Sequence, residues 1–188
     1  TSIVYWRRTY RAVESGQIPA QNSRKGIHCP GQRPPYGDRP LMHIMEMRVP
    51  WHDTDSANIV HHANYFHWTE QAEIELFRKS GKSRKQIGEE TGTMVPRLHV
   101  ECDHFSPAYE DDLIEVRTKV LKLTEKSFHF HHEIHRPADG THLATVEMVI
   151  CCAKILEDGT MRVHIIPDVM AAELRKYLAP EAPGGDSE

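Results

Sequence analysis

Residues 51–78 read Trp-His-Asp-Thr-Asp-Ser-Ala-Asn-Ile-Val-His-His-Ala-Asn-Tyr-Phe-His-Trp-Thr-Glu-Gln-Ala-Glu-Ile-Glu-Leu-Phe-Arg, a loop rich in carboxylates and histidines followed by a helical pattern. Apolar side chains recur at helical spacing in the second half of this stretch: Tyr65, Phe66, Trp68, Ala72, Leu76 and Phe77. Asn64 is a favourable N-cap, because its side-chain oxygen can accept a hydrogen bond from a free first-turn amide. The sequence therefore predicts a helix over residues 65–79 that begins where the acidic loop ends.

Two carboxylates, Asp53 and Asp55, come just before the positive end of this predicted helix. First-turn amides and the helix dipole favour negative charge, so an oxyanion could be stabilised there. Asp55 lies nine residues before Asn64, close enough in sequence to act beside that oxyanion. The alternative is that Asp53 and Asp55 only form turns and that His61 and His62 are only exposed.

The run from Asp53 to Trp68 resembles the active-site segment of the hotdog-fold acyl-CoA thioesterases, in the branch that contains 4-hydroxybenzoyl-CoA thioesterase and the YbgC-type enzymes. Three later stretches agree with this family in order and spacing, and extend the resemblance over about residues 43–178: Phe105–Leu113, Lys126–Phe128 and Asp158-Gly159. The resemblance implies an α+β fold, with an antiparallel β-sheet wrapped around one long helix in a single hotdog domain, residues 42–180.

The same resemblance assigns roles to the residues of the loop and of the helix start. Asp55 is expected to be catalytic, as a general base for water or as a nucleophile. The backbone N–H of His62 is expected to polarise the thioester carbonyl, and its side chain, like that of His61, to contact the acyl group or assist proton transfer. His61, Asn64 and Tyr65 are expected to bind substrate. Asp53 is expected to support the loop.

Two basic residues, Lys126 and Arg162, match family positions that contact the nucleotide phosphates of coenzyme A. The alternative for each is a solvated surface side chain. The chain departs from the family at Asn58 and Glu110, where glycine is usual. Asn tolerates a positive φ better than most residues, so the first departure is compatible with the loop. No cofactor is expected.

The remaining pattern predicts strands and short helices around the long one. Gly81 is a C-cap or turn residue, and Ser83–Thr91 forms a short helix that stops at Gly92. Strands are predicted at Ile44–Val49, Val95–Phe105, Leu113–Leu123, Ser127–Arg136 and His142–Glu157. Residues Met161–Ile166 continue or follow the last strand, and Asp168 caps a final helix that ends at Leu178.

Composition limits the function further. The 188 residues, 39% of them hydrophobic, suffice for one core, and no apolar run reaches the length of a membrane span. Residues 1–41 carry seven Lys or Arg and two acids, a net charge of +5, so the rest of the chain, with −9, is too acidic to suggest nucleic-acid binding. The four cysteines lack metal-site spacing and suggest reduced thiols in a cytoplasmic protein.

The two ends of the chain read differently from the body. Residues 1–41 are rich in Gly, Pro, Gln and Ser without a sustained period, which predicts a basic, disordered or non-native leader. A targeting peptide is the alternative interpretation. Residues 181–188 are expected to be a mobile tail.

Three alternatives remain for the function. In the predicted strand 127–136, alternation places His129, His131, Glu133 and His135 on one face, which is either a zinc site or a polar outer face; we expect no metal. A hotdog-fold enoyl-CoA hydratase and a non-catalytic acyl-CoA-binding protein are the other two. Because hotdog sheets pair edge to edge, we also expect a homodimer or homotetramer.

Overall fold

The computed structural model describes residues 42–180, so the predicted leader (1–41) and tail (181–188) lie outside the described residues. The elements in chain order are β1 (His43–Arg48), the 3-10 helix η1 (Trp51–Asp53), α2 (His62–Arg78), α3 (Arg84–Thr91), β2 (Arg97–His104), β3 (Leu113–Leu123), β4 (Ser127–Arg136), β5 (Thr141–Cys151), β6 (Ala153–Ile155), β7 (Met161–Val163) and α4 (Asp168–Arg175).

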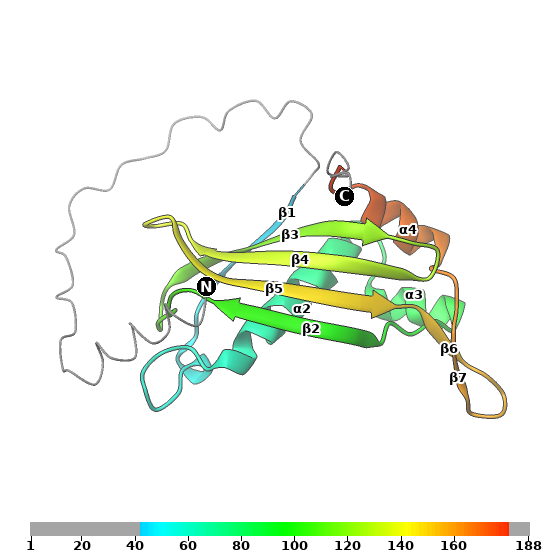
Figure 1. Cartoon of the computed structure of the whole chain (residues 1–188), viewed down its shortest axis with the longest axis horizontal. Coiled ribbons are helices and arrows are strands. Elements are labelled where there is room, and N and C mark those ends of the chain that lie inside the picture. Colours follow the sequence, from blue (N-terminus) through cyan, green and yellow to red (C-terminus); the bar gives the residue numbers. More distant parts are fainter. Residues whose placement is uncertain (1–41, 181–188) are drawn as a thin grey trace, which may run out of the picture. The chain divides into compact units, whose positions relative to one another are not determined.

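Five strands form one antiparallel sheet in the order β1-β3-β4-β5-β2, and α2 lies along one of its faces (Figure 1). The apolar stripe of α2 is buried against the inner side chains of the sheet, and Ala72 and Leu76 are fully enclosed. A second, two-stranded sheet, β6–β7, projects beyond the end of β5. The α+β layout predicted from the sequence, an antiparallel sheet around one long helix, is confirmed.

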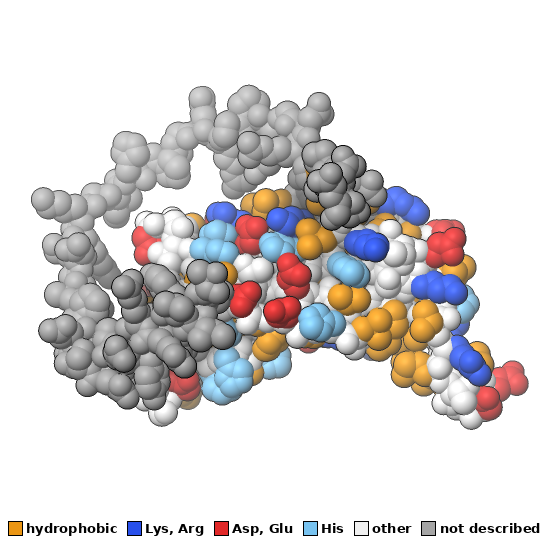
Figure 2. Space-filling model, viewed as in Figure 1, with side chains coloured by type: hydrophobic (Ala, Val, Ile, Leu, Met, Phe, Trp, Pro, Cys, Tyr) orange, Lys and Arg blue, Asp and Glu red, His pale blue; other side chains and the backbone are white. Residues whose placement is uncertain are grey.

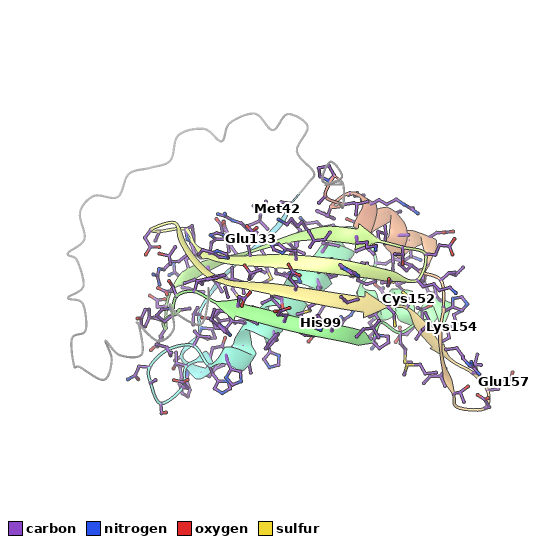
Figure 3. The ribbon with its side chains drawn as sticks, viewed as in Figure 1. Met42, His99, Glu133, Cys152, Lys154 and Glu157 are labelled. Atoms are coloured by element: carbon purple, nitrogen blue, oxygen red, sulfur yellow. The ribbon has the colours of Figure 1, made fainter. Side chains whose placement is uncertain are left out.

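Strand β4 shows the predicted alternation between the two faces of the sheet. Phe128, Phe130, His132 and Ile134 are buried, whereas the residues between them are partly exposed on the outer face. Acidic and histidine side chains gather on that outer face (Figure 2), and Glu133 lies near its middle (Figure 3).

His131 and His135 of the outer face lie close to carboxylates. His131 lies 3.1 Å from Glu147 through Nδ1 and 3.2 Å from Glu133 through Nε2. Within residues 42–180 no group of three or more His, Cys, Asp or Glu side chains is arranged to hold a metal ion. These contacts fit a polar outer face.

Three predicted boundaries are wrong for local reasons. Helix α2 begins at His62, three residues earlier than predicted, and its N-cap is His61 and not Asn64. The last helix has Pro167 as N-cap, so Asp168 lies in its first turn and caps nothing, and the helix ends at Arg175. The predicted strand 142–157 divides into β5 and β6 at Cys152.

Most other boundaries agree with the sequence to within two residues. Helix α3 begins at Arg84, one residue later than predicted, with Ser83 as its N-cap in a capping box with Gln86, and it stops as predicted at Gly92, whose φ is +64°. Gly81, with a φ of +85°, is a turn residue after α2. Strands β3 and β4 have the predicted bounds.

A buried polar network fixes α2 against the sheet. Glu73 of α2 is 1% exposed, and its Oε2 accepts a hydrogen bond of 3.0 Å from Arg97 at the start of β2. Arg84 of α3 lies 3.8 Å from the same oxygen. Burial raises the pKa of Glu73 to about 7, against the opposing effect of the two arginines. The network ties the long helix to the edge strand and to α3.

Two histidines are enclosed in the same core. His132 of β4 lies 2.9 Å from the Thr118 hydroxyl and 3.8 Å from Glu73, and His43 of β1 packs edge-on against Tyr177. Burial lowers the pKa of His132 to about 3 and that of His43 to about 4. Both side chains are therefore neutral in the folded protein near neutral pH.

Candidate active site

The loop before α2 is a short hairpin-like turn whose two arms are hydrogen-bonded to each other. Thr54 forms an antiparallel bridge with Val60, and the Asp55 N–H donates to the Ile59 carbonyl at 2.9 Å. The turn passes through Asn58, whose φ is +57°. The conformation expected of a glycine at this position is thus adopted by asparagine, one of the residues that tolerates it.

Asp55 occupies the first arm of this loop and is partly exposed. Its Oδ1 accepts a hydrogen bond of 2.8 Å from the Ala57 N–H, which forms an Asx turn and fixes the carboxylate. Its other oxygen, Oδ2, accepts no hydrogen bond from residues 42–180. One oxygen therefore orients the group, and the other is open to water or substrate.

The N-terminus of α2 follows directly after the second arm of the loop. The His61 N–H donates to the Asp53 carbonyl, and the His61 ring accepts from the Ala63 N–H at 3.3 Å. Among the described residues, the His62 N–H finds no acceptor. Since nothing else pairs with it, this amide and the dipole of a 17-residue helix are available to a negative oxygen.

Asp53 holds the loop to the helix with both its backbone and its side chain. Its buried carboxylate accepts a hydrogen bond of 2.8 Å from Trp68 Nε1. Its carbonyl accepts from the His61 N–H at 2.9 Å and from Asn64 Nδ2 at 2.7 Å. Asn64 therefore fastens the loop with its amide group instead of capping the helix. The carboxylate of Asp53 is already occupied.

Tyr65, an expected substrate-binding residue, packs against His104 of β2, next to Cys102, and neither of these two β2 residues was predicted as a site residue from the sequence. The Tyr65 ring is buried, and that of His104 meets it edge-on at 4.6 Å. His104 Nε2 lies 3.3 Å from the Cys102 sulfur. Burial, and next the nearby His62, lower the pKa of His104. Alternation along β2 placed these side chains on the inner face, but it could not identify the helix turn opposite them.

The structure separates the predicted site residues into two groups. Asp55, His61, His62, Asn64 and Tyr65 lie at the His104 end of β2. Lys126 and Arg162 are exposed at the opposite end. The Lys126 carbonyl accepts from Cys152, and Arg162 is the cross-strand partner of Lys154 in the projecting hairpin (Figure 3). The length of β2, about 24 Å at ~3.4 Å per residue, lies between them.

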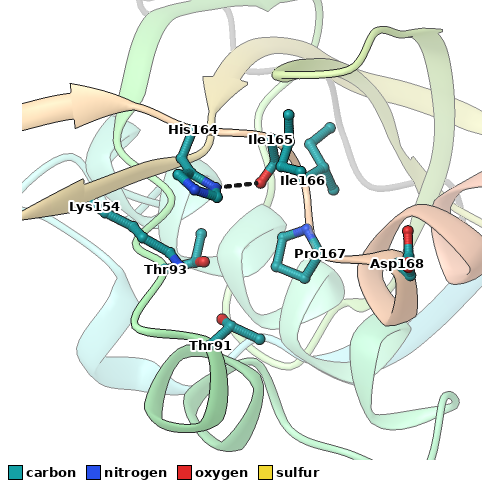
Figure 4. Close-up of a pocket in the computed structure, with 8 residues that line it drawn as sticks. All are labelled: Thr91, Thr93, Lys154, His164, Ile165, Ile166, Pro167 and Asp168. Carbon is teal, nitrogen blue, oxygen red and sulfur yellow. Dashed lines mark hydrogen bonds between the residues drawn. The ribbon is translucent and has the colours of Figure 1, made fainter.

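A cavity of about 190 Å³ lies at the same end as Lys126 and Arg162, between α3, the β6–β7 hairpin and α4 (Figure 4). The sequence does not reveal it, because its walls come from three separate segments without a shared motif: Thr91, Thr93, Lys154, His164, Ile165, Ile166, Pro167 and Asp168. In addition, no helix of the described residues is long and apolar enough to cross a membrane.

Comparisons of the sequence and of the structure with known proteins point to the same superfamily. A sequence model of the thioesterase-like superfamily matches residues 49–174. The acyl-CoA thioester hydrolase YbgC of Escherichia coli is 28% identical over 124 residues, which cover 65% of this chain and 88% of that protein.

Solved structures agree with this match. A hypothetical protein from Aquifex aeolicus superposes with a TM-score of 0.61 and 27% identity, over 70% of this chain and 98% of that one. The 4-hydroxybenzoyl-CoA thioesterase from Pseudomonas sp. strain CBS-3 superposes with a TM-score of 0.62 and 23% identity, over 72% and 98% of the two chains. At 23% identity, the similarity to the Pseudomonas enzyme shows a shared fold only.

Proposed function

The chain belongs to the thioesterase-like superfamily and has its hotdog fold, and on this basis we propose that it hydrolyses an acyl-CoA thioester to a free acid and coenzyme A. Two observations together carry the proposal: Asp55 has one carboxylate oxygen, and His62 a backbone N–H, that form no hydrogen bond within the described residues. Both flank the N-terminus of one long helix. Thioester hydrolysis needs these two functions, a base or nucleophile and a site for the developing oxyanion.

Asp55 is the group that reacts in this proposal. Its Oδ2 takes a proton from water that attacks the carbonyl carbon, or it attacks that carbon itself and forms a mixed anhydride that water then opens. In both routes the carbon–sulfur bond breaks and the thiolate of coenzyme A leaves. The Asx turn to Ala57 keeps the carboxylate in one orientation without using both oxygens.

The N-terminus of α2 stabilises the carbonyl oxygen as it becomes negative. The His62 N–H supplies the donor, and the aligned peptide dipoles of α2 add to it. His61, Asn64 and Tyr65 shape the wall around the acyl group. The rings of His61 and His62 lie 4.2 Å apart, so the two side chains form one exposed surface at the helix start.

We propose that the active site is completed by a second copy of this chain. Strand β2 is an open sheet edge, and Leu98 and Val100 on it are 63% and 39% exposed. Antiparallel pairing of two such edges brings the Arg97 end of one strand beside the His104 end of the other. Lys126 and Arg162 of one copy then lie on the side of Asp55 of the other, where they hold the nucleotide phosphates. Light scattering should give at least twice the mass of one chain. A fully active monomer would refute this arrangement.

A panel of acyl-CoA substrates tests the proposed reaction. Release of free thiol, followed with a thiol-reactive dye, is expected for at least one acyl chain. A hydratase would instead add water to an enoyl-CoA without releasing thiol, and a binding protein would show affinity by calorimetry without turnover. Either result would replace the thioesterase proposal, and the panel also identifies the acyl group.

A further inference from the structure

We propose that Glu73 and His132 form a buried pH switch, which fastens helix α2 to strand β2 while Glu73 is charged and releases Arg97 of β2 when Glu73 takes up a proton. The inference goes beyond the proposed reaction, which uses none of these residues. It concerns the core, where α2 lies along the inner face of the sheet (Figure 1). The side chains of Glu73 and His132 are 1% and 0% exposed there.

The observation that carries the inference is a pair of buried polar atoms that face each other without a hydrogen bond. Glu73 Oε1 and His132 Nε2 lie 3.8 Å apart, and neither has a hydrogen-bond partner within residues 42–180. A buried polar atom without a partner is uncommon and costs free energy. A proton on Glu73 Oε1 would supply the missing bond, because an unprotonated Nε2 can accept it after a small approach of the two groups. The pair is therefore arranged to hold a proton inside the core.

Thr118 of β3 allows His132 to accept this proton without becoming charged. The Thr118 hydroxyl lies 2.9 Å from His132 Nδ1, and a hydroxyl can either donate or accept. While Glu73 is charged, the hydroxyl donates to Nδ1 and the Nε2–H faces the carboxylate. Once Glu73 is protonated, its O–H donates to Nε2 and the Nδ1–H donates to the hydroxyl. Each charge state of Glu73 is thus matched by one tautomer of neutral His132.

The second oxygen of Glu73 connects the long helix to the edge strand. Glu73 Oε2 accepts a hydrogen bond of 3.0 Å from Arg97, the first residue of β2, and lies 3.8 Å from Arg84 of α3. A hydrogen bond to a charged acceptor is roughly twice as strong as one to a neutral acceptor. Loss of the charge on Glu73 therefore weakens its hold on both arginines.

One other carboxylate shares these two arginines. Glu70 of α2 lies 3.1 Å from Arg84 and 3.6 Å from Arg97 through its Oε1. Its side chain is 38% exposed, whereas that of Glu73 is 1% exposed. Glu70 can therefore keep Arg84 when Glu73 is neutral, and Arg97, which is farther from Glu70, is the arginine that is released.

The titratable groups around His132 do not take up this proton near neutral pH. Burial lowers the pKa of His132 itself to about 3 and that of the neighbouring His43 of β1 to about 4. His131 points to the outer face of the sheet, and the β5 partner of His132 is the apolar Val146. Burial raises the pKa of Glu73 to about 7. Glu73 is therefore the group in this cluster that changes charge near neutral pH.

Protonation of Glu73 should release Arg97 without unfolding the protein. Arg97 and Arg84 lower the pKa of Glu73, so a proton on Glu73 must in turn weaken their interaction with it. Burial acts against the arginines and sets the pKa at about 7, above the ordinary value of 4.5. A pKa raised on folding means that protonation in this range favours the folded over the unfolded chain. The proton thus changes the contacts of the folded protein and leaves it folded.

The released segment is the start of an open sheet edge. The pairing of β2 with β5 has an irregular register between Arg97 and His99, and Leu98 between them is 63% exposed. Without its anchor at Glu73, Arg97 turns to solvent and the first residues of β2 open more often. We propose above that a second copy pairs with this edge, so the switch would also act on that association.

Infrared difference spectroscopy of the full chain tests where the proton is held. A buried carboxylic acid gives a C=O stretching band separate from the bands of carboxylates. The wild type should gain one such band as the pH falls, with a midpoint near pH 7. The Glu73→Gln variant, which keeps the size of the side chain but takes up no proton, should lack it. The matched Glu70→Gln variant should keep the band at a somewhat lower midpoint, because Glu70 raises the pKa of Glu73.

Amide hydrogen exchange tests whether the proton acts on β2. Between about pH 8 and pH 6, after correction for the intrinsic exchange rate, residues 97–104 of the wild type should open about 10-fold more often, the effect of weakening one charge-assisted hydrogen bond. Residues 127–136 of the central strand β4 should not change, and the melting temperature should not fall. Glu73→Gln should show the open behaviour at both pH values, and Glu70→Gln should follow the wild type.

The inference is overturned if the wild type gains no carboxylic acid band down to pH 6, or if the band persists in Glu73→Gln. A band that titrates while exchange in β2 stays constant would also overturn it, because the buried acid would then not act on the strand. If Glu73→Gln does not fold, the ring nitrogen chemical shifts of His132 in the wild type provide the test: its tautomer should change with the same midpoint, and one constant tautomer would contradict the switch. None of these measurements uses a thioester, so they stand apart from the outcome of the proposed reaction.

Discussion

Replacing Asp53 and Asp55 in turn by asparagine should separate support from chemistry. The Asp55→Asn change keeps the Asx turn, because the new side-chain oxygen can still accept from the Ala57 N–H. It removes the base or nucleophile, so kcat should fall at least ~10²-fold, equivalent to about 2.7 kcal/mol in the activation barrier. The melting temperature should stay nearly constant.

The Asp53→Asn change should have the opposite profile. The hydrogen bond from Trp68 Nε1 persists to an amide oxygen but loses its charged acceptor, which costs about 1 kcal/mol. In a protein of this length that corresponds to roughly 3 °C in melting temperature. Asp53→Ala leaves the Trp68 N–H without an acceptor, and should cost about 2–3 kcal/mol. Turnover should change less than ~10-fold in both variants.

The assay pairs thiol release at saturating acyl-CoA with thermal unfolding of each variant. Near-native turnover of a correctly folded Asp55→Asn protein would show that Asp55 does not react. A greater kcat loss at Asp53 than at Asp55 would reverse the two assignments.

Three other predictions follow from the structure and the sequence. Deleting residues 1–41 should leave the melting temperature and kcat/KM nearly unchanged, since this composition cannot form a packed core, and a large drop in either would show an integral element. Lys126→Ala combined with Arg162→Ala should raise KM for acyl-CoA several-fold, in a salt-sensitive way, but not for acyl-pantetheine, and equal losses would end the phosphate assignment. The folded pKa values of His43 and His132, about 4 and about 3, lie below the unfolded value of about 6.5, so each histidine should lower the stability as the pH drops from 6.5 toward 4, by at most ~1.4 kcal/mol per pH unit. Glu73, whose pKa burial raises to about 7, acts in the opposite direction between pH 7 and its usual pKa and should offset about one of the two histidines there. Denaturant titrations across this pH range measure how steeply the free energy of unfolding changes with pH, and the His43→Leu substitution should make this dependence less steep.

The layout of the fold was accessible from local patterns. Apolar residues alternate along β4 and recur at helical spacing in α2 up to Phe77, because each element buries one face. A single sequence shows this pattern of apolar residues directly. The predicted start of α2 was wrong because the helix is capped by the ring of His61, a residue type that is not favoured at this position. The side chain of Asn64, the predicted cap, instead donates a hydrogen bond to the Asp53 carbonyl. A tertiary contact decided that boundary, and local propensity could not show it.

The sequence was less informative about groups that meet only in three dimensions. Glu73 interrupts an apolar stripe, which is a readable sign of a buried carboxylate, but its partner Arg97 lies 24 residues away. The family-like turn near Glu110 places its positive φ at Asp111, one residue later. Thr93 carries no sequence signal either, although its buried hydroxyl finds no hydrogen-bond partner within residues 42–180.

The order of residues along the open β2 edge also limits how two such edges can align. His99 and Glu101 both pair with outer-face positions of β5, and Val100 pairs with Met148 on the inner face. If Val100 sits on the two-fold axis, each His99 faces the Glu101 of the other copy, and the two valines meet. A shift that centres the pair on Glu101 sets two carboxylates against each other instead. The charges of His99 and Glu101 would then favour one alignment of two β2 edges, and with it one distance between Asp55 of one copy and the facing end of the other in the proposed dimer.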